Sequence, residues 1–122
     1  MHVLRFWRRR TADQLQARRK AARTEAKAVI QRGNDQLALG RDMLWSPTIR
    51  AALIAGTPWL DVHCPGCNTS RAIDLRTLDR HSLASVGTLV LGLRCGWCPG
   101  SAPMPRLIGL FALPPARRAQ TA

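Results

Sequence analysis

The first third of the chain has the pattern of a long polar helix. Residues 13–32 contain no Gly or Pro, and Ala, Gln, Arg and Lys, which favour helix formation, dominate them. Thr11 has the position of an N-cap, because Gln14 three residues later completes a capping box. We therefore expect residues 1–10 to form a mobile basic tail. The helix is expected to stop near Gly33-Asn34, with continuation through a second apolar pattern, Leu37, Met43 and Leu44, as the alternative. One thin apolar stripe follows the predicted helix: Leu15, Ala22, Ala26 and Val29.

A second, short helix is predicted just before the centre of the chain. Ser46 is a suitable N-cap, and Pro47 fits the first helical position, where its missing N–H has no partner to lose. Gly56 marks the end of this helix, and Pro58 prevents its continuation.

Strand patterns dominate the second half of the chain. Residues 59–63 and 71–75 predict two short strands that form a hairpin, and residues 106–113 predict a closing strand. Residues 74–81 predict a helical turn. The apolar segment 85–93 fits either a helix or a strand, because its two glycines weaken both patterns.

Four cysteines are the strongest chemical signal in the sequence. They form two C-x-x-C pairs, Cys64 with Cys67 and Cys95 with Cys98. Two residues between ligands let one tight turn present both sulfurs to a single ion, and two such turns supply the tetrahedral all-sulfur set that zinc favours. Gly66 and Gly96 are expected to allow the sharp backbone turns. The pattern predicts one structural zinc ion in a zinc ribbon, with four thiolates closing its coordination sphere: Cys64, Cys67, Cys95 and Cys98.

Three other uses of these cysteines stay open on sequence grounds. Two disulfides would need an oxidising compartment, but no apolar signal segment follows the basic residues 1–10. A thioredoxin-like redox site would need one C-x-x-C at a βαβ turn, which this pattern lacks. A four-cysteine site can also hold an iron–sulfur centre.

The predicted fold class is α+β. A basic N-terminal helix and a short second helix precede a small four-cysteine zinc ribbon, which consists of a β-hairpin and a closing strand. We divide the chain into a basic tail with a helical extension (1–45), the zinc-ribbon domain with its leading short helix (46–113) and a disordered C-terminal tail (114–122). Because so short a domain buries a modest core, we expect metal binding to supply much of its stability.

The predicted ribbon also resembles a known group of proteins. The motifs are Cys64-Pro65-Gly66-Cys67 after Trp59-Leu60, the segment DLRTLDRH at 74–81, and Leu93-Arg94-Cys95-Gly96-Trp97-Cys98. Over residues 46–113 they are similar to small bacterial zinc-ribbon proteins. The resemblance implies a zinc site and a bacterial cytoplasmic setting, and it implies no particular activity. The basic helix lies outside the resembling region.

Charge points to polyanionic partners. The chain has 19 Lys and Arg against 7 Asp and Glu, a net charge of +12, and much of the excess precedes Gly33. A basic band on a helix can follow the phosphates of DNA or RNA without reading sequence, and an exposed Trp can stack on a base. The alternatives are a solvated helix face and a Trp ring folded over the metal site. The candidate nucleic-acid-binding residues are Arg8, Arg9, Arg10, Arg18, Arg19, Lys20, Arg23, Lys27, Arg94 and Trp97.

Two other roles compete with nucleic-acid binding. The ribbon is also suited to a protein–protein adaptor, as a rigid platform beside a helix whose apolar stripe docks on a partner. The helix with Phe6 and Trp7 is a weaker candidate for attachment to a membrane surface, because it is poor in large apolar residues. No apolar run reaches the ~20 residues that a bilayer requires, so we expect no membrane span.

Catalysis is not expected from this sequence. HExxH, GxSxG and phosphate-loop motifs are absent, and no pair of carboxylates stands at helical spacing. No small-molecule substrate is evident either. The sequence predicts a non-catalytic nucleic-acid-binding or regulatory module in the cytoplasm, with the protein–protein adaptor as the alternative.

Overall fold

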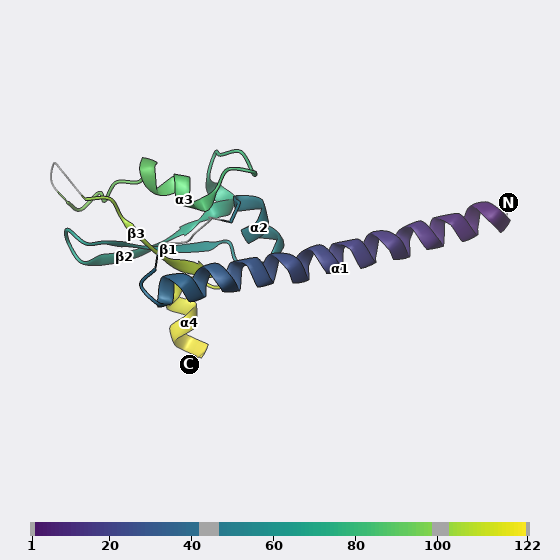
Figure 1. Cartoon of the computed structure of the whole chain (residues 1–122), viewed down its shortest axis with the longest axis horizontal. Helices are drawn as coiled ribbons and strands as arrows, with labels where there is room; N and C mark the ends of the chain where they lie inside the picture. The colour runs from purple at the N-terminus through teal and green to yellow at the C-terminus, as the bar shows by residue number, and fades with distance from the viewer. Residues whose placement is uncertain (1, 42–46, 99–102, 122) are drawn as a thin grey trace.

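The computed structural model describes residues 2–41, 47–98 and 103–121, with the backbone alone at 2–10 and 119–121. Helices and one three-stranded antiparallel sheet make up this part of the chain (Figure 1), which confirms the α+β prediction. In chain order the elements are α1 (His2–Ala38), α2 (Ile49–Ile54), β1 (Trp59–Cys64), β2 (Thr69–Asp74), the 3₁₀ turn η1 (Leu75–Thr77), α3 (Val86–Leu89), the 3₁₀ turn η2 (Val90–Gly92), β3 (Arg106–Phe111) and α4 (Pro115–Thr121).

Helix α1 dominates the outline of the molecule, because most of it extends away from the sheet (Figure 1). Its 37 residues span about 55 Å at 1.5 Å per residue. Every side chain from residue 11 to residue 25 is exposed, and burial begins at Ala26 and Ile30. The C-terminal third of α1 therefore belongs to the core, while the turns from residue 11 to residue 25 lie in solvent.

The start of α1 corrects two predictions. The segment expected to be a mobile tail, residues 1–10, is helical from His2 onward, and Thr11 lies inside the helix rather than at its N-cap. Residues 2–10 contain no Gly or Pro. Because extending a helix is far easier than nucleating one, nothing in this segment stops a helix that has formed further along the chain.

The end of α1 lies beyond the predicted stop at Gly33. Gly33 is buried within the helix, where a glycine costs about 1 kcal/mol relative to Ala. Packing of the neighbouring turns against the sheet offsets this cost. The helix ends at Ala38, and Gly40 just after it has a φ of 73°. The N–H of Gly40 donates to Leu37 and that of Arg41 donates to Gln36, which is the Schellman arrangement.

Helix α2 starts later than predicted. Its N-cap is Thr48, whose hydroxyl accepts a backbone N–H of the first turn at 3.0 Å, so Pro47 is not the first helical residue. The predicted cap, Ser46, lies outside the described residues. Thr48 pairs with Ser85 in an antiparallel bridge, and this contact with a distant segment holds its backbone extended. The helix ends before Gly56, as predicted.

The sheet has the order β2-β1-β3, with β1 at its centre. Both predicted hairpin strands and the predicted closing strand are present, and each pairs with β1 in antiparallel fashion. Alternate residues of β1 are buried, namely Leu60, Val62 and Cys64. One face of the sheet therefore carries the core, and Leu110 of β3 lies opposite Leu60 at its centre.

The core fills the space between this face of the sheet and the helices. The ambiguous segment 85–93 is helical, because Ser85 caps α3 and the chain continues directly into η2. The predicted turn within 74–81 is η1. The core includes residues of α1, so it crosses the boundary drawn at residue 45. Its buried members are Ala26, Ile30, Ile49, Ala52, Ala55, Leu60, Val62, Leu75, Val86, Leu89 and Leu110.

Residues 115–121 form a helix, which corrects the prediction of a disordered tail over this part of 114–122. In Figure 1, α4 lies on the side of the sheet opposite α2 and α3. Arg118 of α4 forms a 2.6 Å ion pair with Asp61 of β1, and its guanidinium lies 4.0 Å from the ring centroid of Phe111. Pro115 stands at the first helical position, a signal that was available in the sequence.

Asn34 joins α1 to the outer edge of the sheet. Its side-chain amide donates to the carbonyl of Leu110 and accepts from the N–H of Leu110, both at 2.8 Å. The amide therefore supplies the hydrogen bonds that a fourth strand would make at this point of β3. A Cβ on Gly109 would lie 3.0 Å from the Asn34 oxygen, so this glycine leaves room for the contact.

We predict that Asn34→Ala lowers the free energy of unfolding by about 1–3 kcal/mol, because it leaves the buried N–H and C=O of Leu110 without their partner. Urea unfolding of the metal-loaded protein would measure the change. Gln31→Ala is the matched control on the same helix, since it removes an exposed amide that contacts Asp35, and we expect a change within about 0.5 kcal/mol. Equal effects of the two substitutions would contradict this role of Asn34.

Candidate metal centre

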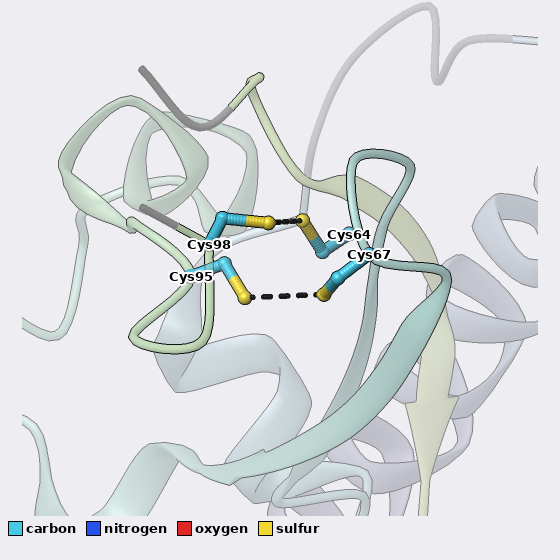
Figure 2. A group of neighbouring side chains, drawn as sticks. All are labelled: Cys64, Cys67, Cys95 and Cys98. Atoms are coloured by element: carbon cyan, nitrogen blue, oxygen red, sulfur yellow. Dashed lines mark hydrogen bonds between the residues drawn. The ribbon is translucent and has the colours of Figure 1, made fainter. Parts of the chain in front are cut away.

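The four cysteines converge at one end of the sheet, as predicted. Figure 2 shows their sulfurs turned toward one another, with Cys64 and Cys67 in the β1–β2 hairpin and Cys95 and Cys98 in the turn after η2. All four sulfurs lie within 4.8 Å of one another. The sulfurs of Cys67 and Cys95 are 3.5 Å apart, and those of Cys64 and Cys98 are 3.6 Å apart. All four cysteines are free thiols, so neither pair is a disulfide.

This spacing fits one metal ion. Tetrahedral zinc–sulfur bonds of about 2.3 Å place the sulfurs about 3.8 Å from each other. The two cross-pair distances, 3.5 and 3.6 Å, lie close to that value. Each C-x-x-C turn contributes two ligands, so the ion would join two segments that are distant in sequence. The four thiols are therefore able to bind a metal ion.

The first pair of cysteines is positioned by the hairpin. Cys64 is the last residue of β1 and is buried, whereas Cys67 is exposed in the turn. Asn68 closes the turn with a φ of 57°, in the left-handed region that Asn tolerates better than most residues. Thr69 then starts β2 directly opposite Cys64. Hairpin register thus places Cys67 just beyond the end of the sheet, within reach of the second pair.

The glycines of the two turns act differently from the prediction. Among the described glycines, positive φ angles occur at Gly40 and Gly56, and neither Gly66 nor Gly96 has one. Gly66 is required by space, because a Cβ there would lie 2.9 Å from the Pro103 side chain and 3.1 Å from the sulfur of Cys98. Gly96 has open space around it.

The second pair of cysteines is carried by the short helical segment on the sheet. Val86 and Leu89 of α3 are buried in the core, and Leu93 packs against it just before Cys95. The segment between the two cysteine pairs therefore crosses the sheet face and returns to the end at which the hairpin turns. Burial of these apolar side chains brings the two pairs together before any metal is considered.

The thiols differ in acidity because they share one small space. The pKa of Cys67 is lowered to about 6 by hydrogen bonding, first with Thr69 and then with Cys95. The Oγ1 of Thr69 lies 3.2 Å from the Cys67 sulfur. Hydrogen bonding, first with Cys64 and then with Cys67, raises the pKa of Cys98 to about 12. Thus the Cys67 thiolate forms readily, whereas Cys98 resists ionisation because hydrogen bonding with the neighbouring sulfurs favours its protonated form. A divalent cation would remove this resistance.

Trp97 and Arg94 lie beside the metal centre and both are exposed. Trp97 is 68% exposed, so most of its surface is open to solvent. Arg71 of β2, which the sequence did not single out, stacks against that ring at 5.0 Å from its centroid. A small cavity of about 200 Å³ adjoins the centre, with Arg71, Arg94 and Cys95 in its lining.

The remaining candidate residues lie elsewhere. The α1 cations Arg18, Arg19, Lys20, Arg23 and Lys27 are exposed along the part of the helix that precedes or enters the core. Arg8, Arg9 and Arg10 fall where the backbone alone is described, and that backbone is helical. Sequence reasoning missed Thr69 and Arg71. Thr69 contacts Cys67 two residues away, within the hairpin, so its position next to the cysteine pair was an available signal. Arg71 contacts Trp97 only when the hairpin and the second cysteine turn meet.

No protein-family model, curated protein or solved structure matches the chain. No helix in the described part of the chain is both long enough and apolar enough to cross a membrane.

We predict one divalent metal ion per chain, and Cys98→Ser should weaken its binding by more than about 100-fold, since loss of a ligand costs more than the 10–100-fold typical of an outer contact. Native mass spectrometry and chelator competition would measure both. His81→Gln is the control, because His81 has ligand chemistry but lies outside the cysteine cluster, and it should retain the ion. Full retention by Cys98→Ser would exclude a four-sulfur site.

Metal affinity should fall as the pH falls. Metal binds thiolates, and the raised pKa of Cys98, about 12, means that its proton must be displaced at neutral pH. Below the pKa of Cys67, about 6, that thiolate is lost as well. Chelator competition between about pH 6 and 8 should therefore show affinity decreasing by at least about tenfold per pH unit. An affinity independent of pH would contradict binding through these thiols.

Proposed function

We propose that the protein is a non-catalytic, structural-zinc module that binds nucleic acid through helix α1. Zinc is supported by the four-thiol set, which leaves no position for water or substrate and is the usual composition of a structural zinc site. An iron–sulfur cluster would place several atoms between the cysteines and hold their sulfurs farther apart than 3.5 and 3.6 Å. The membership in the bacterial zinc-ribbon group suggested by the sequence is part of this proposal.

The observation that carries the nucleic-acid proposal is the state of the cations on α1. Arg18, Arg19, Lys20, Arg23 and Lys27 are all exposed. None of these five forms a salt bridge with a described residue, whereas Arg76 pairs with Asp74 and Arg118 pairs with Asp61. Their charges are therefore available to an external polyanion.

The dimensions of the band suit a phosphate backbone. From Arg18 to Lys27 the axis of α1 rises about 14 Å. Phosphates follow one another at about 3.4 Å of rise along one strand of B-DNA, so the band covers about four phosphates of one strand. Because the helix extends from the sheet, a long ligand can approach these side chains without contacting the metal centre (Figure 1).

A protein–protein adaptor is the second candidate, and the apolar stripe of α1 bears on it. Ala26 is 6% exposed in the core, and Val29 is half-buried, so the protein's own fold uses this end of the stripe. Leu15, 48% exposed, and Ala22 are left for a partner. These two side chains offer little apolar surface, which favours charge over apolar contact as the main attraction between α1 and a partner.

The proposed setting is the cytoplasm. Four neighbouring thiols are stable there as reduced metal ligands, because cytosolic glutathione and thioredoxin keep cysteines reduced. In an oxidising compartment, the close approach of these sulfurs would favour disulfide formation over metal binding.

Fluorescence anisotropy with a labelled oligonucleotide, measured across a salt series, tests nucleic-acid binding by α1. Affinity should fall steeply as salt rises, and Arg19→Gln/Arg23→Gln should reduce the slope of log affinity against log salt by about 1.4–1.8. The matched control, Arg41→Gln/Arg50→Gln, removes the same charge from exposed positions outside the band and should leave that slope close to the wild-type value. Salt-independent binding to a protein partner, without nucleic-acid binding, would favour the adaptor instead.

A further inference from the structure

A groove lies between α1 and the outer edge of β3. Its volume is about 1080 Å³, and its lining extends on α1 from Arg23 to Ala38 and on β3 from Arg106 to Phe111. Apolar side chains, among them Ile108 and Leu107, contribute to its surface. The groove is open to solvent, and Ile108 is 41% exposed within it. The core residues Ile30, Ala55 and Leu110 also line this space.

The charges that border the groove are mostly positive. Arg23 and Lys27 contribute from α1 and Arg106 contributes from β3, against one carboxylate, that of Asp35. His63 of β1 also lies in the lining. Cations therefore border the groove on both the helix and the sheet. If the basic residues of α1 served only to keep that helix solvated, no cation would be needed on the sheet side of the groove.

The groove continues into the basic band of α1. Lys20, Arg23 and Lys27 are spaced three and four residues apart, so they lie along one face of the helix. Arg23 and Lys27 of this row line the groove. A ligand that follows the row toward the C-terminus of α1 is therefore led into the groove and toward β3.

The edge of β3 adds hydrogen-bonding groups. β3 is an edge strand, paired with β1 on one side. On its other side, Asn34 satisfies the N–H and C=O of Leu110. Nearer Arg106 and Ile108, no described side chain or strand lies along this side of β3 to make the hydrogen bonds that Asn34 makes with Leu110. The register between β3 and β1 also shifts in this stretch, between Asp61 and Val62. The backbone here can bond to a ligand in the groove.

We propose that this groove binds a single-stranded segment of nucleic acid, with its phosphates at Arg23, Lys27 and Arg106 and its bases against Ile108 and the β3 edge. The proposal rests on the nucleic-acid function proposed above and specifies which form of nucleic acid is bound. A single strand exposes both phosphates and apolar base faces, and the groove offers partners for both. A duplex conceals its base faces, so it would gain nothing from Ile108 and would be bound by phosphate contacts alone.

The test compares single-stranded and duplex oligonucleotides of equal length, with the zinc-loaded full chain. Wild-type protein should bind the single strand about tenfold more tightly than the duplex. Arg106→Gln should weaken single-strand binding about fivefold at about 0.1 M salt, as loss of one phosphate contact implies. Ile108→Glu, which adds a negative charge to the groove and leaves the α1 cations in place, should weaken it further. Arg50→Gln is the control, since Arg50 is exposed on α2 and does not line the groove.

Three results would overturn the proposal, and each has a different meaning. If the wild type binds the duplex as tightly as the single strand, and Arg106→Gln equals Arg50→Gln, the groove is not the site, while binding by α1 stands. If neither oligonucleotide binds, the proposed function itself fails. If polyglutamate binds as tightly as the single strand and loses affinity in Arg106→Gln, the groove is a site for acidic polypeptide.

Discussion

The register of β1 is the constraint on which both the core and the metal centre depend. Leu60 and Val62 of this strand are buried in the core, and Cys64 is buried at the start of the hairpin turn. These residues share one face because side chains alternate along a strand. A slip by one residue would turn all of them to the opposite face at once. The packing that stabilises the sheet therefore also aims Cys64 at the second cysteine pair.

Two kinds of feature could be predicted from the sequence because their causes are local. The C-x-x-C spacing limits each pair to one tight turn, so the cluster of Cys64, Cys67, Cys95 and Cys98 follows once the two turns meet. The strands were recognisable from their apolar alternation and flanking breakers.

The segment 85–93 was ambiguous because a short apolar run fits a helix or a strand. Its N-cap hydrogen bond, from the N–H of Thr88 to the hydroxyl of Ser85, identifies it as a helix only in the folded structure.

Other features depend on contacts between distant segments and left no local signal. Asn34 was expected near a helix end, yet its amide bonds to Leu110 across 76 positions and the helix continues past it. Thr48 replaces the predicted cap because it pairs with Ser85. Arg118 contacts Asp61 and Phe111, so the C-terminal residues fold as α4. The groove beside β3 was equally invisible, since Arg106 gains meaning only when α1 lies beside that strand.

The core fixes the C-terminal part of α1 but not the turns from residue 11 to residue 25, and this difference bears on function. Near Ala26 and Ile30 the helix is fixed by burial, whereas its side chains from residue 11 to residue 25 have solvent around them. Arg23 stands four residues from both Arg19 and Lys27, and each such like-charge pair destabilises a helix by about 0.2–0.5 kcal/mol. If this helix had no ligand, acidic residues at some of these positions would stabilise it by removing the repulsion. A bound polyanion relieves the same repulsion. Binding would therefore stabilise the part of α1 that the core does not reach.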